Sequence, residues 1–150
     1  MRSVQASIEI NAAPEEALDA FMEFDHLKEW WGVERALIEK RGGGAYTLAW
    51  GISNAGLKYI SSGSIGSYEP GRRLEIVNLV YLNAEMPPLG PMSLSVHVKA
   101  SVNGTLLELT QAGYQSGEVW DWYYEAVRKA WPAVLLELKK YLEKKEHERA

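Results

Sequence analysis

The sequence predicts an α+β domain: a curved antiparallel sheet of about seven strands, with two short helices after the first strand and one long C-terminal helix packed across the sheet. Short segments that alternate apolar and polar residues follow one another along most of the chain, and turns rich in glycine or proline separate them. The final segment differs, because its apolar residues recur at spacings of three and four. The length fits one domain, which we place at residues 1–150.

The first strand and the two short helices are predicted before residue 33. Residues 3–10 carry valine, alanine and isoleucine at the even positions, which is typical of a strand with one buried face. Pro14 suits the first position of a helix, where its missing N–H is not needed, and the two glutamates after it favour the positive helix N-terminus. Asp25 is placed to begin a second short helix, which ends in Trp30-Trp31-Gly32.

Six further segments alternate with a period of two residues and are predicted to be strands. They cover residues 36–38, 46–50, 57–68, 73–81, 92–100 and 106–111. Turn sequences at 53–56 and at Asn103-Gly104 are short enough for hairpins, so the sheet is expected to be antiparallel. Each strand then has an apolar face that another layer must cover.

The C-terminal segment is the one predicted element long enough to cover the sheet. Its apolar stripe consists of Trp120, Tyr124, Val127, Trp131, Leu135, Leu138 and Leu142. A twisted sheet diverges from a straight helix along part of its length, so a cavity opens there unless bulky side chains fill it. We therefore expect the leucine half of the helix to pack tightly and the aromatic half to line a cavity.

Composition argues against several classes of protein. The net charge of −4 does not suit a general nucleic-acid-binding protein, which needs a basic surface. The absence of cysteine removes disulfides and thiolate metal sites and makes a reducing cytoplasm the expected location. No apolar run approaches the roughly 20 residues of a membrane span, and residues 1–10 lack the apolar run of a signal peptide. The six tryptophans and eight tyrosines either line a pocket with their polar tips or fill the core.

Several short motifs, in this order and spacing, resemble those of the START-like, or SRPBCC, superfamily of helix-grip domains. They are INAAPEE at 10–16, WWG at 30–32, RGGGAY at 41–46, GSI at 63–65, PGRRL at 70–74, LTQAGY at 109–114 and WPAVLLEL at 131–138. Within the superfamily the chain resembles the bacterial and archaeal branch related to the activator of the heat-shock-protein-90 ATPase. The resemblance implies the helix-grip fold. The functions of the superfamily's members range from ligand binding and polyketide cyclisation to chaperone activation. Gln111 stands where many relatives have histidine and Asn78 where many have tryptophan, so we expect a reshaped pocket.

No constellation of residues predicts catalysis. The run Gly42–Gly44 lacks the lysine and the following helix of a phosphate-binding loop. His97 lies in a predicted strand, but alternation turns it to solvent if its valine neighbours face the core. Among the candidate carboxylates, Glu75 lies on a strand, whereas Glu118 and Asp121 suit a helix N-terminus. The histidines share no metal-ligand spacing, so neither a metal nor a cofactor is predicted.

The predicted ligand-binding residues lie on the apolar sheet face, after the second helix and on the first half of the last helix. They are Trp30, Trp31, Tyr46, Leu48, Trp50, Val77, Leu79, Tyr81, Trp120 and Tyr124. Asn78 or Gln111 would orient a ligand if strand parity turns it inward. The main hypothesis is binding of a small apolar or amphipathic molecule. The alternatives are a cyclase- or hydrolase-type enzyme using the same cavity and a chaperone-associated interaction module, and an exposed aromatic rim would equally serve as a homodimer contact.

Overall fold

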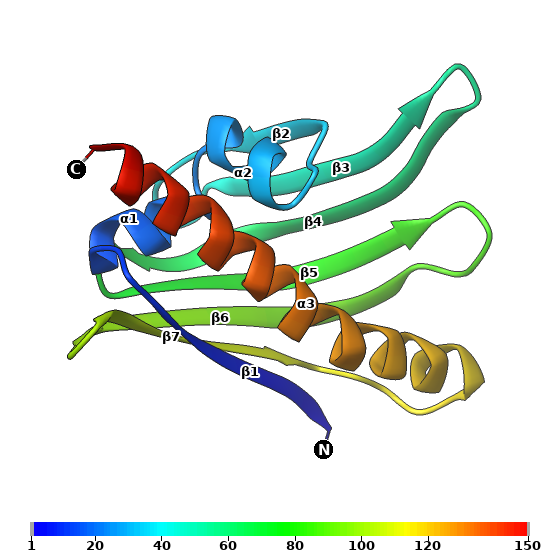
Figure 1. Cartoon of the computed structure of the whole chain (residues 1–150). Helices are drawn as coiled ribbons and strands as arrows, with labels where there is room; N and C mark the ends of the chain where they lie inside the picture. The colour runs from blue at the N-terminus through cyan, green and yellow to red at the C-terminus, as the bar shows by residue number, and fades with distance from the viewer. Residues whose placement is uncertain (1, 150) are drawn as a thin grey trace.

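A seven-stranded antiparallel sheet with a long helix across one face makes up the computed structural model, which describes residues 2–149 (Figure 1). The elements are β1 (Ser3–Ile10), α1 (Pro14–Asp19), α2 (Phe24–Trp30), β2 (Arg35–Ile38), β3 (Ala45–Ser53), β4 (Gly56–Glu69), β5 (Arg73–Asn83), β6 (Leu89–Ser101), β7 (Gly104–Ala112) and α3 (Glu118–Arg149). The predicted fold class is confirmed, including the two short helices after the first strand.

The strand order is β1-β7-β6-β5-β4-β3-β2, and every neighbouring pair is antiparallel. Strands β2 to β7 follow one another as successive neighbours, whereas β1 lies at the opposite edge, beside β7. Helices α1 and α2 therefore carry the chain from one edge of the sheet to the other. Figure 1 shows α3 lying across the sheet, with its C-terminal half close to α1 and α2.

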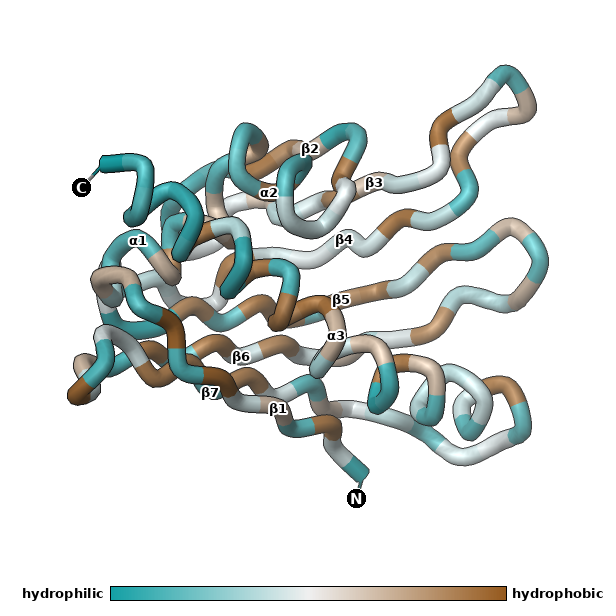
Figure 2. Tube along the Cα trace, in the orientation of Figure 1, coloured by the Kyte–Doolittle hydropathy of each residue, from teal (hydrophilic) through white to brown (hydrophobic). Residues whose placement is uncertain are grey.

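The core lies between the sheet and the C-terminal half of α3. Leu135, Leu138 and Leu142 are buried there together with apolar residues of α1, α2 and β7. Figure 2 shows apolar positions along β5, β6 and β7 beneath the helix and hydrophilic positions at its C-terminal end. The expected tight packing of the leucine half is confirmed.

A bulge interrupts the alternation of β5. The register of β5 against β6 shifts between Ile76 and Leu79, and Asn78 has a φ of 52°, in the left-handed region. Because of the extra residue, Ile76 and Leu79 both face the covered side, at 0% and 6% exposure, whereas Asn78 is exposed. Strand parity thus changes within β5, so Asn78 does not point inward.

No helix among residues 2–149 is long and apolar enough to cross a membrane.

Candidate ligand-binding cavity

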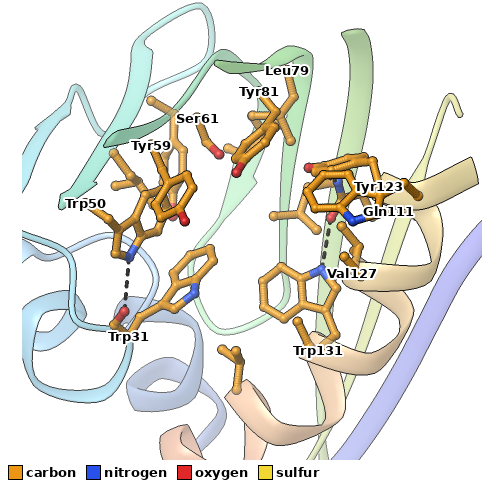
Figure 3. A pocket seen from close by; sticks show the side chains of 18 residues that line it. Trp31, Trp50, Tyr59, Ser61, Leu79, Tyr81, Gln111, Tyr123, Val127 and Trp131 are labelled. Carbon is orange, nitrogen blue, oxygen red and sulfur yellow. Dashed lines mark hydrogen bonds between the residues drawn. The ribbon is translucent and has the colours of Figure 1, made fainter. Parts of the chain in front are cut away.

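A cavity of about 440 Å³ lies between the sheet and the N-terminal half of α3. It is lined by Trp31, Tyr46, Leu48, Trp50, Tyr59, Ser61, Ile76, Leu79, Tyr81, Leu94, Gln111, Trp122, Tyr123, Ala126, Val127, Ala130, Trp131 and Val134. Among residues 2–149, no Asp, Glu, Lys, Arg or His side chain belongs to the lining. Figure 3 shows the labelled side chains arranged around an open space.

Strand pairing builds the sheet wall. Leu48 of β3 pairs with Ser61 of β4, which in turn pairs with Tyr81 of β5, so these three residues form one row across the sheet. Trp50 and Tyr59 form the next row toward the hairpin end. Paired residues on antiparallel strands share a face, so both rows present their side chains to the cavity.

Tyr46 is a buried residue of the cavity lining, and a hydrogen bond holds its side chain in place. Its ring is 2% exposed, and its hydroxyl donates to the carbonyl oxygen of Phe21 over 2.6 Å. Burial raises the pKa of Tyr46 above its ordinary range. The side chain therefore stays neutral and bonded, and it contributes an aromatic surface rather than a free polar group.

A tryptophan cluster closes one side of the cavity. Trp30 is 4% exposed, donates through Nε1 to the carbonyl oxygen of Ala20 over 2.9 Å, and stacks on Trp31 at a centroid distance of 5.3 Å. Trp31 meets Trp50 and Trp131 at 5.1 Å each, and its carbonyl oxygen accepts from Trp50 Nε1 over 3.0 Å. Trp31 thus joins the end of α2 to both the sheet and α3 (Figure 3).

Gln111 of β7 joins the sheet to α3 on the other side. It is 4% exposed, and its Oε1 accepts from Trp131 Nε1 over 2.9 Å. Its Nε2 donates to the hydroxyl oxygen of Tyr123 over 3.3 Å and lies 3.6 Å from Met92 Sδ. One buried amide therefore sets the positions of two α3 side chains that form the helical wall.

Three tyrosines complete the ring of aromatic side chains. Tyr59 stacks on Tyr81 at 6.2 Å, and Tyr81 stacks on Tyr123 at 4.8 Å. Burial raises the pKa of Tyr123 to about 12, although the hydrogen bond from Gln111 lowers it, and burial also raises the pKa of Tyr81. Both phenols are neutral at physiological pH, so the cavity carries no charge.

Six of the predicted site residues lie together in the lining: Trp31, Tyr46, Leu48, Trp50, Leu79 and Tyr81. Trp30 lies behind the cavity, where it supports Trp31 from the core. Val77 does not line the cavity, because the β5 bulge turns Ile76 inward in its place.

Trp120 and Tyr124 also lie outside the cavity. Both rings pack edge-on against the buried Tyr114, at 6.2 Å and 5.1 Å, and the guanidinium of Arg2 lies 4.9 Å from the Tyr124 ring. The cavity face of α3 is instead the neighbouring line of residues that begins at Tyr123. The expected aromatic wall is present, but different residues provide it.

The predicted site omitted Tyr59, Ser61, Tyr123 and Trp131, which all line the cavity. The hairpin at 53–56 contained the signal for the first two, because pairing β4 with β3 places them opposite Trp50 and Leu48. Gln111 was a conditional candidate, and parity does turn it inward. Trp131 was on the predicted apolar stripe of the helix, although not among the binding residues.

The candidate catalytic groups lie away from the cavity. His97 is exposed on β6, and Glu75, Glu118 and Asp121 are not part of the lining. Across residues 2–149 no group of three or more His, Asp or Glu side chains is arranged to hold a metal ion.

The sheet, the long helix and the cavity between them together define a helix-grip domain. The chain belongs to the family described as Activator of Hsp90 ATPase homolog 1-like protein, whose model matches residues 11–143. The sequence resemblance to this branch of the START-like superfamily is thereby confirmed. No functionally curated protein matches the sequence.

Several solved structures share the fold over nearly the whole chain. MLL2253 from Mesorhizobium loti is 17% identical, with a TM-score of 0.76 and coverage of 95% of this chain and 98% of that chain. The Aha1 dimer from Colwellia psychrerythraea is 21% identical, with a TM-score of 0.72 and coverage of 95% and 97%. CalU16 from Micromonospora echinospora is 22% identical, with a TM-score of 0.68 and coverage of 98% and 80%. At these identities the likeness shows the fold alone.

Proposed function

We propose that the protein binds a small, uncharged, apolar or amphipathic molecule in the cavity between the sheet and α3. The observation that carries this proposal is the lining itself, which is aromatic and aliphatic, with a few hydroxyl and amide groups and no charged side chain. Its volume of about 440 Å³ falls within the range of roughly 300–1,000 Å³ typical of small-molecule sites.

The aromatic rings favour a ligand with a flat ring system. Trp31, which follows α2, Tyr81 of β5 and Tyr123 of α3 all contribute rings to the cavity lining. Offset-stacked and edge-to-face contacts between rings stabilise by about 0.5–1.5 kcal/mol beyond the area they bury. A bound ring system can therefore extend the network of aromatic contacts that already surrounds the space.

The lack of charge disfavours ionised ligands. A carboxylate in this cavity would lose its hydration and meet no Lys, Arg or His side chain. We accordingly expect fluorene to bind more tightly than fluorene-9-carboxylate, which has the same rings and one negative charge.

The two alternatives have less support. A cyclase or hydrolase would need an acid or base in the cavity, and His97 and Glu75 do not line it. A chaperone-associated role is motivated by the family's description alone. Homodimer formation, as in the Aha1 dimer from Colwellia psychrerythraea, is a further proposal, motivated by Trp122, which is 52% exposed at the edge of the cavity.

A thermal-shift screen with uncharged fused-ring aromatics and sterols tests the main proposal. A ligand at 100 times its Kd adds about 2.7 kcal/mol to the free energy of unfolding, which raises the Tm by several degrees. Val127→Trp fills the cavity and should weaken binding about tenfold or more, because its larger side chain occupies ligand space. Leu136→Trp, on the exposed outer face of α3, is the matched control.

Binding that survives Val127→Trp unchanged would place the ligand elsewhere. A screen in which no compound raises the Tm of the wild-type protein would contradict the proposed function.

A further inference from the structure

The hydrogen bonds around Gln111 have a fixed direction that begins at Trp131. An indole N–H can only donate, so the Gln111 oxygen, 2.9 Å from Trp131 Nε1, must be the acceptor. This contact determines the orientation of the Gln111 amide, with its oxygen toward Trp131. The Gln111 nitrogen therefore faces Tyr123 (Figure 3).

The amide in turn fixes the role of the Tyr123 hydroxyl. A side-chain amide nitrogen can only donate, so Tyr123 accepts from Gln111 Nε2 over 3.3 Å. The hydroxyl proton must then point away from Gln111, and no side chain or backbone acceptor among residues 2–149 receives it. Accepting one hydrogen bond also polarises an O–H group and strengthens it as a donor.

The other polar groups that residues 2–149 contribute to the lining are mostly hydrogen-bond donors, and none of them accepts the Tyr123 hydroxyl proton. The Trp31 indole N–H can only donate and likewise has no acceptor among the residues described. The Tyr81 hydroxyl accepts from Asn83 Nδ2 over 3.5 Å, a longer contact than the 3.3 Å at Tyr123. The hydroxyls of Tyr59 and Ser61 can donate as well as accept, and no residue of the lining among residues 2–149 carries a carboxylate. The cavity as a whole offers more hydrogen-bond donors than obligate acceptors.

We infer that the cavity selects uncharged aromatic ligands that carry a hydrogen-bond acceptor, such as an aryl ketone, and that the acceptor oxygen binds the Tyr123 hydroxyl. This inference rests on the proposed function and adds the chemical class of the ligand. A buried carbonyl loses its hydrogen bonds to water, so it binds well only where the protein provides a donor. Tyr123 is that donor, and Gln111 is the positioning residue that orients it.

Fluorene and 9-fluorenone test the inference, because they share one ring frame and differ in a CH₂ group against a carbonyl. The Kd of each is measured by calorimetry or tryptophan fluorescence for the wild-type protein, Tyr123→Phe and Tyr124→Phe. Tyr123→Phe keeps the stacked ring and removes the hydroxyl. Tyr124→Phe makes the same change one residue further along α3, outside the cavity, and is the matched control.

We expect the wild-type protein and Tyr124→Phe to bind fluorenone roughly threefold to tenfold more tightly than fluorene, the value of one net neutral hydrogen bond. Tyr123→Phe should lose this preference and bind fluorenone no more tightly than fluorene, because a buried carbonyl is then left without its donor. A Tm close to that of Tyr124→Phe shows that the variant is folded.

Two results separate the inference from the proposed function. Equal affinity of the wild-type protein for both compounds, or a ketone preference that persists in Tyr123→Phe, would overturn the inference and leave the binding function intact. Failure of the wild-type protein to bind either compound would overturn both.

Discussion

The two halves of α3 meet the sheet in different ways. In the C-terminal half, Leu135, Leu138 and Leu142 are 1%, 0% and 1% exposed and belong to the continuous core. In the N-terminal half, Tyr123 and Val127 border a cavity instead of filling it. One helix therefore packs closely against the sheet at one end and forms one wall of an open cavity at the other.

The polar contacts of the two halves differ as well. Lys139 in the C-terminal half donates to the carbonyl oxygen of Glu9 over 2.8 Å, and Glu143 accepts from the backbone N–H of Asn11 over 2.9 Å, so this half is tied to β1 and the segment after it.

The N-terminal half is also bonded to the start of the chain, where Tyr124 donates to the carbonyl oxygen of Ser3 over 3.5 Å and Arg2 pairs with Asp121 over 2.7 Å. It differs from the C-terminal half in being held from the inside as well, by Gln111. Stability should depend mainly on the C-terminal half and ligand binding on the N-terminal half.

The largest expected effect comes from truncating the close-packed half. Leu138→Ala should lower the free energy of unfolding by about 2–5 kcal/mol, because it leaves a cavity in a fully buried site. Val127→Ala, at a half-buried position beside an existing space, should cost less than about 1 kcal/mol. Urea unfolding of both variants measures the contrast, and equal losses would show that the two halves contribute alike.

A smaller effect is expected from removing the polar link of the aromatic half. Gln111→Leu leaves the Trp131 N–H buried without an acceptor, which should cost about 1–3 kcal/mol. The control is Thr110→Val on the opposite face of β7, which should stay within about 0.5 kcal/mol of the wild type. A Gln111→Leu variant as stable as the control would mean that the amide is not needed to hold α3.

The leucine half could be predicted from the sequence and the aromatic half only in part, for a geometric reason. Leu135, Leu138 and Leu142 form a single line at helical spacing, so the buried face is unambiguous. Further toward the N-terminus, large aromatic residues occur on several sides of the helix, and spacing alone cannot choose between lines that begin at Trp120 and at Tyr123. Which of the two lines faces the cavity depends on a tertiary contact: Trp120 packs against Tyr114, outside the cavity, and Tyr123 lines it.

Along β5, prediction from alternation was correct only on one side of the bulge. Leu79 and Tyr81 face the cavity as expected, but Val77, two residues earlier, does not. The left-handed conformation of Asn78 adds the residue that changes parity. A regular period of two cannot reveal such an insertion, whereas asparagine, which tolerates this conformation, is a weak signal of it.

The bulge beneath the aromatic half gives a third prediction. Asn78→Val should lower the free energy of unfolding by about 1–2 kcal/mol, because a β-branched residue is disfavoured in the left-handed region. Asn78→Gly should be neutral or slightly stabilising, since glycine adopts this conformation freely. Thermal unfolding distinguishes the two variants. If Asn78→Val is as stable as the wild type, β5 has no bulge here, and different β5 residues form the sheet wall of the cavity.

The smallest expected effect concerns pH, to which the two halves should respond differently. In the C-terminal half, the hydroxyl of Tyr141 lies 2.6 Å from Nδ1 of His26, which belongs to α2. Partial burial lowers the pKa of His26 below 6.5, and the nearby Lys145 lowers it further, although Glu23 and neighbouring aspartates oppose this. In the N-terminal half the cavity has no charged group, and the pKa of Tyr123 is about 12.

The sign of the pH effect follows from that lowered pKa. The unfolded chain takes up the His26 proton at a higher pH than the folded protein, so the contribution of His26 to stability is complete above pH 6.5 and is lost as the pH falls through the folded pKa. Between pH 7 and pH 5 the Tm should therefore fall less in His26→Gln than in the wild type, since the carboxylates contribute equally to both. The Kd for fluorene should stay constant over the same range. A Kd that changes with pH would show that a titrating group acts on the cavity. It would contradict the expectation that pH affects the C-terminal half of α3 but not ligand binding at the N-terminal half.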